Sequence, residues 1–194
     1  MFSNIKHDFA RYYKIELGNT DPTLIRKIRL LLKMPGLQSI LIYRLGYWIL
    51  QEKNNVFFSY RVMFLPVYVL LSYLTTKMYG INISVRANIG SGLYVGHFAG
   101  IEVGKSQIGS NCSIHQHVKI NSKKLISDNQ QTMVIIGNNT WIGPHAVINS
   151  PVTISDGVTI SSGSRVVSNI DSASLVMGDP ARIIRKDFDN SLLL

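Results

Sequence analysis

The chain has 194 residues, of which 46% are hydrophobic and 16% are charged, and its formal net charge is +9. This length and apolar content suit one domain with an appended region. Cys112 is the single cysteine, which excludes an internal disulfide, a CxxC redox site and a zinc site built from several cysteines. A lone cysteine fits a reducing compartment, so we expect a cytoplasmic protein.

Residues 1–80 carry most of the positive charge. They hold 11 basic and 4 acidic residues, a difference of +7, whereas residues 81–194 hold 9 and 7, a difference of +2. The basic residues are interleaved with apolar runs, as in residues 24–33 (LIRKIRLLLK), and we expect this half to be helical. No zinc-finger spacing, Arg/Gly-rich tract or RNP-like aromatic motif accompanies them, so we do not expect nucleic-acid binding.

The most apolar stretch covers residues 62–75, is 14 residues long and contains Pro66. A membrane-spanning helix needs about 20 apolar residues, so this stretch is too short to cross a bilayer. Two interpretations stay open. Either the helix packs against the rest of the protein or another subunit, or this basic and apolar region lies peripherally on the inner face of the cytoplasmic membrane.

After Gly80 the sequence follows a six-residue period. One unbroken series of aliphatic residues with this spacing consists of Ile136, Ile142, Ile148, Ile154, Ile160 and Val166. Neither a helix nor a simple hairpin has this period, but six residues can form one flat side of a triangular coil with the aliphatic side chain inside. The pattern predicts a mainly β fold, a left-handed parallel β-helix of hexapeptide repeats over residues 81–175, preceded by an N-terminal α-helical region over residues 1–80.

Two irregularities interrupt the repeat. The phase slips by two residues at Val103, in the segment that follows the first coil. Further on, 16 residues separate Ile120 from Ile136, so we expect residues 121–133 to leave the coil as a loop. A loop on a rigid scaffold is a common place for binding groups. Residues 176–194 follow the last coil as a tail.

The repeats, the loop and residues 176–184 (VMGDPARII) together resemble the hexapeptide acyltransferases. The tail is similar to the family's G-x-P-A-[KR] segment, which helps to bind coenzyme A. Residues 35–48 resemble the helix that leads to the β-helix in serine acetyltransferases. Residues 95–104 (VGHFAGIEVG) resemble the catalytic segment of those enzymes, L-D-H-A-T-G-I-V-V-G. The resemblance covers roughly residues 35–186. It implies an acetyl-CoA-dependent homotrimer with active sites between neighbouring β-helices.

Three positions depart from the serine acetyltransferase pattern. Gly96 and Asn82 stand where those enzymes have aspartates, and Met133 replaces the second histidine of their loop. The groups that would hold the ammonium and carboxylate of an amino acid are therefore largely missing. What is left resembles the colanic-acid and capsule-type polysaccharide O-acetyltransferases, so we expect acetyl transfer to a sugar hydroxyl of a surface polysaccharide or its precursor.

The resemblance makes His97 the general base. An imidazole titrates near neutrality and can take the hydroxyl proton as the oxygen attacks a thioester. A carboxylate commonly orients this base in related enzymes, and the sequence leaves that partner open between Asn82 and Glu102. Candidates for substrate binding lie about one coil further along the chain: His115, Gln116 and His117. Three of these imidazoles would suit a metal, but the tail and the loop favour acyl transfer, so no metal is expected.

Coenzyme A carries phosphates, so its groove should end in cations. Arg182, Arg185 and Lys186 follow the last coil and fit this role, together with Pro180 of the tail motif. Residues at matching corners of the coils would line the pantetheine arm: Trp141, Gly143, Ser161 and Ser162.

Two other functions stay open. The same chemistry would serve a serine O-acetyltransferase, and a non-catalytic β-helix would bind a partner or a membrane through its basic half. For an enzyme, we expect direct transfer without an acyl-enzyme, because Cys112 occupies an ordinary repeat position.

Overall fold

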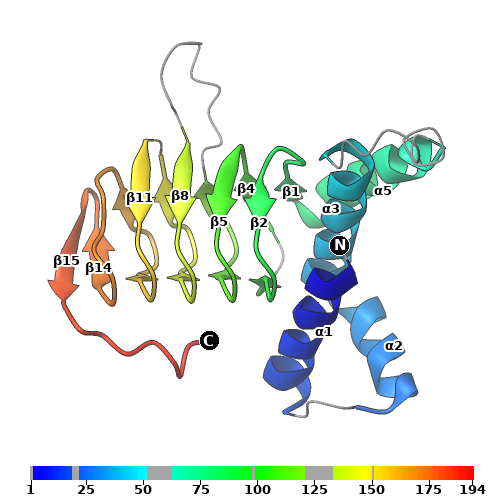
Figure 1. Cartoon of the computed structure of the whole chain (residues 1–194), viewed down its shortest axis with the longest axis horizontal. Coiled ribbons are helices and arrows are strands. Elements are labelled where there is room, and N and C mark those ends of the chain that lie inside the picture. The colour runs from blue at the N-terminus through cyan, green and yellow to red at the C-terminus, as the bar shows by residue number, and fades with distance from the viewer. Residues whose placement is uncertain (1, 19–21, 52–62, 98, 121–132, 150) are drawn as a thin grey trace.

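The computed structural model describes residues 2–18, 22–51, 63–97, 99–120, 133–149 and 151–194. A stack of β-coils makes up most of its length, and helices pack against the first coil (Figure 1). The described helices are α1 (Phe2–Leu17), α2 (Leu24–Lys33), α3 (Pro35–Gln51) and α5 (Leu65–Tyr79). None of the helices within these ranges is long and apolar enough to span a membrane.

The strands form three sheets, which we call A, B and C. Sheet A contains β1 (Ile81–Ile83), β4 (Ile101–Val103), β7 (Lys119–Ile120), β10 (Val147–Ile148) and β13 (Arg165–Val166). Sheet B contains β2 (Asn88–Ile89), β5 (Ser106–Ile108), β8 (Val134–Ile136) and β11 (Val152–Ile154). Sheet C contains β3 (Tyr94–Val95), β6 (Ser113–Ile114), β9 (Trp141–Ile142), β12 (Thr159–Ile160), β14 (Leu175–Gly178) and β15 (Ala181–Arg185).

Successive strands pass from sheet A to B to C, and each strand pairs in parallel with its counterpart in the next coil. Only the β14–β15 pair, among the described strands, is antiparallel. The predicted parallel β-helix with N-terminal helices is thereby confirmed. The aliphatic series with a spacing of six forms its core, since Ile142, Ile148 and Ile160 have no exposed surface.

The phase slip is an insertion of two residues. Val95 pairs with Ile114 and Val103 pairs with Ile120, so eight residue steps in the first interval match six in the second. The two extra residues fall in the turn between β3 and β4. The second irregularity, the predicted loop at 121–133, lies outside the described residues except for Met133, which is half-buried.

The first coil has no coil before it, and helices α1 and α3 provide hydrogen-bond partners for its backbone. The Tyr12 hydroxyl donates to the Val95 carbonyl at 2.9 Å, and the Tyr43 hydroxyl donates to the Ala87 carbonyl at 2.8 Å. Arg44 donates to the Ile89 carbonyl at 2.6 Å. These bonds satisfy polar groups that would otherwise be buried without partners.

Two arginines and one carboxylate complete this junction. Asp8 pairs with Arg44 at 3.0 Å, with side chains 0% and 4% exposed, and accepts the Leu93 N–H at 2.9 Å. Arg11 donates to the Gly92 carbonyl, and also to the Cys112 carbonyl at 2.8 Å. Two of the basic residues counted in the N-terminal half, Arg11 and Arg44, therefore stabilise the fold.

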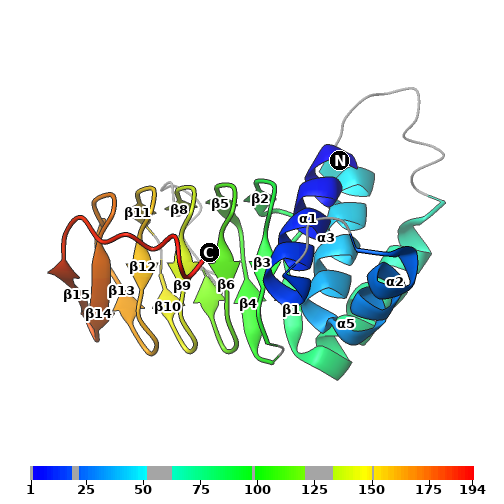
Figure 2. The same ribbon diagram turned by 90° about the horizontal axis from the view of Figure 1, so that it is seen from below.

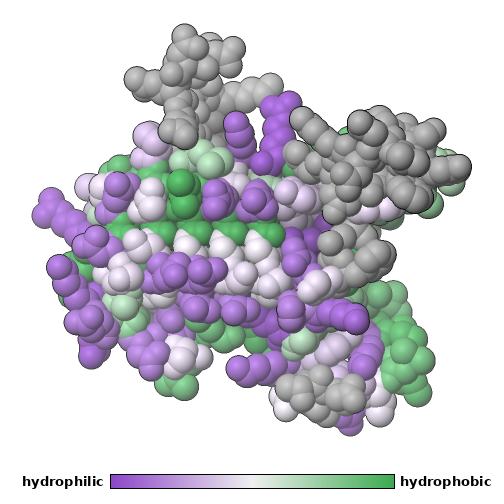
Figure 3. Space-filling view, in the orientation of Figure 1, coloured by the Kyte–Doolittle hydropathy of each residue, from purple (hydrophilic) through white to green (hydrophobic). Residues whose placement is uncertain are grey.

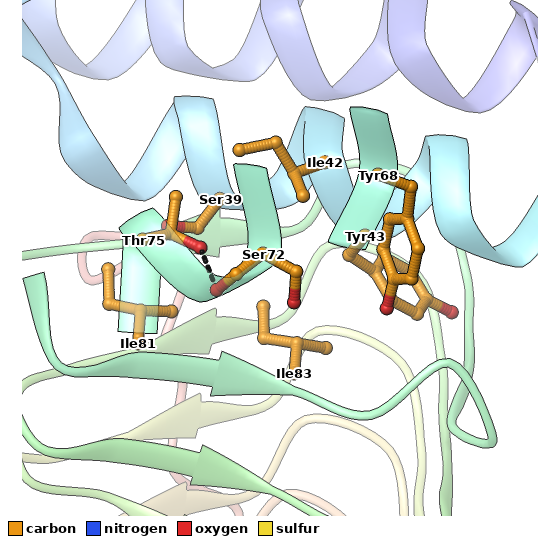
Figure 4. Close-up of a pocket in the computed structure, with 8 residues that line it drawn as sticks. All are labelled: Ser39, Ile42, Tyr43, Tyr68, Ser72, Thr75, Ile81 and Ile83. Carbon is orange, nitrogen blue, oxygen red and sulfur yellow. Dashed lines mark hydrogen bonds between the residues drawn. The ribbon is translucent and has the colours of Figure 1, made fainter. Parts of the chain in front are cut away.

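Helix α5 packs on α3 and on β1 at the same end of the β-helix (Figure 4). It begins at Leu65 and ends at Tyr79, whereas the apolar stretch predicted for it ran from residue 62 to 75; residue 62 lies outside the described part. A cavity of about 10 Å³ lies between the three elements, where Thr75 donates to the Ser72 carbonyl at 3.0 Å. Its volume is that of about one water, so it is not a substrate site.

The C-terminal tail turns back along the coils after β15 (Figure 2). The Asn190 side chain donates to the carbonyls of Asn139 and Gly157, at 2.9 and 3.2 Å. A groove of about 840 Å³ separates this tail from α1, with Arg11 and Lys14 on one side and Phe188 on the other.

Candidate active site

His97 lies in the turn between β3 and β4, where sheet C passes into sheet A. Its side chain is exposed, and its backbone has a positive φ of 49°. The two-residue insertion falls in this same turn, so its backbone differs from that of the turns stacked beneath it. A non-glycine residue adopts such a conformation at a small energetic cost, and this is common at functional sites.

The turns of the later coils stack under the His97 turn. The His117 N–H donates to the Ala99 carbonyl at 2.8 Å, and the His145 N–H donates to the Gln116 carbonyl at 2.9 Å. The imidazoles of His117 and His145 stack at 4.6 Å between ring centroids. The predicted substrate-binding segment is thus adjacent to His97, although His117 faces His145 in the following turn.

His115 occupies the centre of an aromatic cluster. Its ring centroid is 4.7 Å from that of Trp141 and 6.5 Å from that of Tyr94. Its Nδ1 lies 3.0 Å from the Ile142 carbonyl, which can only accept, so Nδ1 carries the proton and Nε2 is free to accept one. Burial lowers the pKa of His115, against a raising effect of that hydrogen bond, and the nearby His97 lowers it further.

Gly96 leaves room for this cluster. A Cβ at this position would come within 2.8 Å of the Tyr94 ring and 3.2 Å of the His115 ring. An aspartate could not replace Gly96 without moving these aromatic side chains. The Tyr94 hydroxyl donates to Glu16 of α1 at 2.6 Å, which ties the helical region to the cluster. Burial, with this hydrogen bond, raises the pKa of Tyr94 above its ordinary range.

Asn82 and Glu102 are neighbours on the outer face of sheet A. They occupy paired positions in β1 and β4, and Lys119 follows Glu102 in the same row. All three side chains are exposed. Among the contacts of the described residues, no hydrogen bond joins Asn82 or Glu102 to His97, so the role of these two residues in orienting the base stays a prediction.

Gln116 is partly buried in the turn that stacks against the His97 turn. Its Oε1 is buried and has no hydrogen-bond partner within the described part of the chain. A buried amide oxygen without a partner is unfavourable, so a bound donor would improve its environment. This property is compatible with the predicted substrate-binding role of Gln116.

The predicted coenzyme-binding residues follow sheet C and its turns. Trp141 is half-buried on β9, and Gly143 is buried in the turn after it. A Cβ at Gly143 would meet the Ile160 carbonyl at 2.8 Å, which accounts for the glycine. The remaining candidates lie in the turn after β12 and on the terminal hairpin: Ser161, Ser162, Pro180, Arg182, Arg185 and Lys186. Apart from half-buried Ser161, these six are exposed.

Cys112 does not have the properties of a nucleophile. Its side chain has no exposed surface, and its Sγ lies 3.2 Å from the Gly137 carbonyl. Burial raises the pKa of the thiol to about 11. A thiol attacks as the thiolate, so this environment makes Cys112 unreactive at neutral pH.

Among the described residues, no group of three or more His, Cys, Asp or Glu side chains is placed to hold a metal ion.

The sequence analysis above predicts neither the aromatic cluster around His115 nor the hydrogen bond between Tyr94 and Glu16. Tyr94 and Trp141 each stand one residue before an inward aliphatic, Val95 and Ile142, so they occupy equivalent positions in their coils. That equivalence could have indicated an aromatic cluster around His115. The hydrogen bond from Tyr94 to Glu16 joins residues 78 positions apart, and no local pattern reports it.

The sequence was compared with known proteins. The family model described as bacterial transferase hexapeptide (six repeats) matches residues 133–168. Serine acetyltransferase of Synechococcus elongatus is 28% identical over 186 residues, which cover 95% of this chain and 69% of the relative. Serine acetyltransferase of Helicobacter pylori is 28% identical over 168 residues, covering 86% of this chain and 91% of the relative. The chain resembles serine acetyltransferases.

Solved structures of serine acetyltransferases have a similar fold. The serine acetyltransferase of Neisseria gonorrhoeae matches with a TM-score of 0.75 and 22% identity, over 97% of this chain and 68% of that one. A Brucella abortus serine acetyltransferase, solved in complex with coenzyme A, matches with a TM-score of 0.75 and 22% identity, over 95% and 68%. The predicted resemblance to serine acetyltransferase-like hexapeptide-repeat acyltransferases is therefore supported. The narrower one, to polysaccharide O-acetyltransferases, finds no support among these relatives.

Proposed function

We propose that the protein is an acetyl-CoA-dependent O-acetyltransferase with His97 as its general base. The observation that carries this proposal is the position of His97, in the one enlarged turn among the stacked turns between sheets C and A that the structure describes. The similarity to serine acetyltransferases over most of the chain supports the same activity.

In the proposed reaction the His97 imidazole takes the proton of the acceptor hydroxyl as its oxygen attacks the thioester carbonyl. The tetrahedral intermediate then collapses, the C–S bond breaks, and the thiolate of coenzyme A takes the proton back from His97. The products are an acetyl ester and free coenzyme A. The buried, unreactive Cys112 supports transfer without a covalent enzyme intermediate.

Serine is the first acceptor to test, because the similar proteins described above are serine acetyltransferases. A sugar hydroxyl is the second candidate, and a specific observation favours it. Gly96 and Asn82 leave the surroundings of His97 without two carboxylates of the serine enzymes, and the aromatic cluster fills the space beside Gly96. An amino acid would then lack two of the carboxylates that the resemblance assigns to binding its ammonium group.

The coenzyme is proposed to lie along sheet C. The exposed cations Arg182, Arg185 and Lys186 would contact its phosphates. A homotrimer, with each site completed by a neighbouring copy, is proposed from the resemblance to hexapeptide-repeat enzymes, and light scattering in solution would measure it.

Release of free thiol from acetyl-CoA tests the activity and the acceptor together. The purified chain is mixed with acetyl-CoA and either serine or a panel of oligosaccharides, and products are identified by mass spectrometry. Saturable thiol release with one acceptor supports the proposal and names the acceptor class. Saturable coenzyme binding without transfer to any hydroxyl, or no coenzyme binding at all, would contradict it and leave a non-catalytic binding module.

A further inference from the structure

Helix α2 has a broad apolar face that points away from the rest of the protein. Leu24, Ile25, Ile28 and Leu32 are 71%, 73%, 51% and 74% exposed. With about 100° per residue, these four side chains span an arc of about 100° on one side of the helix. On the opposite side Leu30 is only 5% exposed and belongs to the core.

All the charged residues of α2 are basic. Arg26, Lys27, Arg29 and Lys33 lie within its ten residues. Arg29 and Lys33 line a surface hollow of about 500 Å³ together with Ile25, Ile28 and Leu32. The apolar face is therefore edged by positive charge.

We infer that α2 is an interfacial helix that docks the protein on an anionic lipid bilayer. A short helix with a strongly apolar face and a basic border binds in the headgroup region through both buried apolar area and attraction to anionic lipids. A second copy of the chain is a poorer occupant, because pairing two α2 faces would bring eight cations together without an acidic residue on either helix.

Helix α5 lies at the same end of the molecule and also exposes apolar side chains, including Leu70 at 58% and Met78 at 67%. Figure 3 shows apolar surface gathered at this end, where Figure 1 places α2. The described helix α5 carries one cation, Lys77, and its charge does not distinguish a bilayer from a protein. The inference therefore rests on α2.

Vesicle flotation tests the inference with the full chain. The vesicles are phosphatidylcholine alone or phosphatidylcholine mixed with phosphatidylglycerol, each at low and high salt. We expect binding to the mixed vesicles and at least about tenfold weaker binding to the neutral ones. Ile25→Asn with Leu32→Asn, or Arg29→Gln with Lys33→Gln, should each weaken binding about tenfold or more. The matched control is Val167→Asn with Arg86→Gln, exposed residues on the β-helix.

The substituted α2 residues are exposed, so circular dichroism and the unfolding temperature should stay unchanged. Thiol release with a soluble acceptor should also stay unchanged, which separates this inference from the proposed enzyme activity. Equal binding to both vesicle types, no binding at all, or equal loss in the control would overturn the inference. A smaller molecular mass for the α2 variants by light scattering would also overturn it, since α2 would then join copies of the chain.

Discussion

The β-helix and the helical region are stabilised in different ways. In the β-helix each coil adds aliphatic side chains to a buried column and pairs its backbone with the neighbouring coils. The same six-residue pattern therefore provides the core and the hydrogen bonds along the chain. The helical region covers the first coil, and there individual polar side chains such as Asp8, Tyr12 and Arg44 satisfy single backbone groups. The difference indicates that a repeating core tolerates small changes, whereas the junction depends on a few residues.

The largest effect on stability is expected from Arg44→Met at the junction. The change leaves the Asp8 carboxylate buried without its cation and removes the donor to the Ile89 carbonyl. Breaking a buried ion pair costs about 3–5 kcal/mol of the free energy of unfolding, which urea denaturation measures. The control is Arg165→Gln, which breaks the exposed pair with Asp179 and should cost about 0–1 kcal/mol. Equal losses would show that burial does not matter at the junction.

A smaller loss is expected from Ile148→Val within the β-helix core. Ile148 has no exposed surface, so the change removes one buried methylene and leaves a small void. Such changes cost about 0.5–1.5 kcal/mol by urea denaturation. Ile184→Val, at a position 61% exposed on β15, should change stability little. A loss at Ile148 as large as that at Arg44 would contradict the proposed difference between the regions.

The smallest effect concerns pH. Burial lowers the pKa of His115, so the unfolded chain binds a proton more readily than the folded one near pH 6.5. Stability should be full above about pH 6.5, fall as the pH drops below it, and level off below the folded-state pKa. His115→Asn should reduce this slope in urea titrations at several pH values. An unchanged slope would show that another group causes it.

These regions also differ in how far the sequence predicts them. The spacing of Ile136, Ile142 and Ile148 predicts the coils, because each hexapeptide makes the same local structure and the core follows from repetition. The slip at Val103 predicts the unusual turn at His97 for the same reason. Both predictions use neighbouring residues alone.

The junction could not be predicted in this way. Asp8 and Arg44 are 36 positions apart, and Tyr12 reaches Val95 across 83 positions. Such contacts depend on how helices dock on the finished coil, which composition and spacing do not encode. For the same reason the sequence does not show that Asn82 and Glu102 occupy paired positions on sheet A.

The most direct measurement of the central claim is turnover by His97→Asn, compared with His145→Asn. Asparagine tolerates the positive φ of both positions, 49° and 62°, so neither change should strain the backbone. We predict that His97→Asn lowers kcat/KM with acetyl-CoA by about 10²–10⁴-fold, while calorimetric coenzyme binding and the activity of His145→Asn stay close to wild type. Near wild-type turnover in His97→Asn, with coenzyme binding intact, would contradict the assignment of His97 as the base.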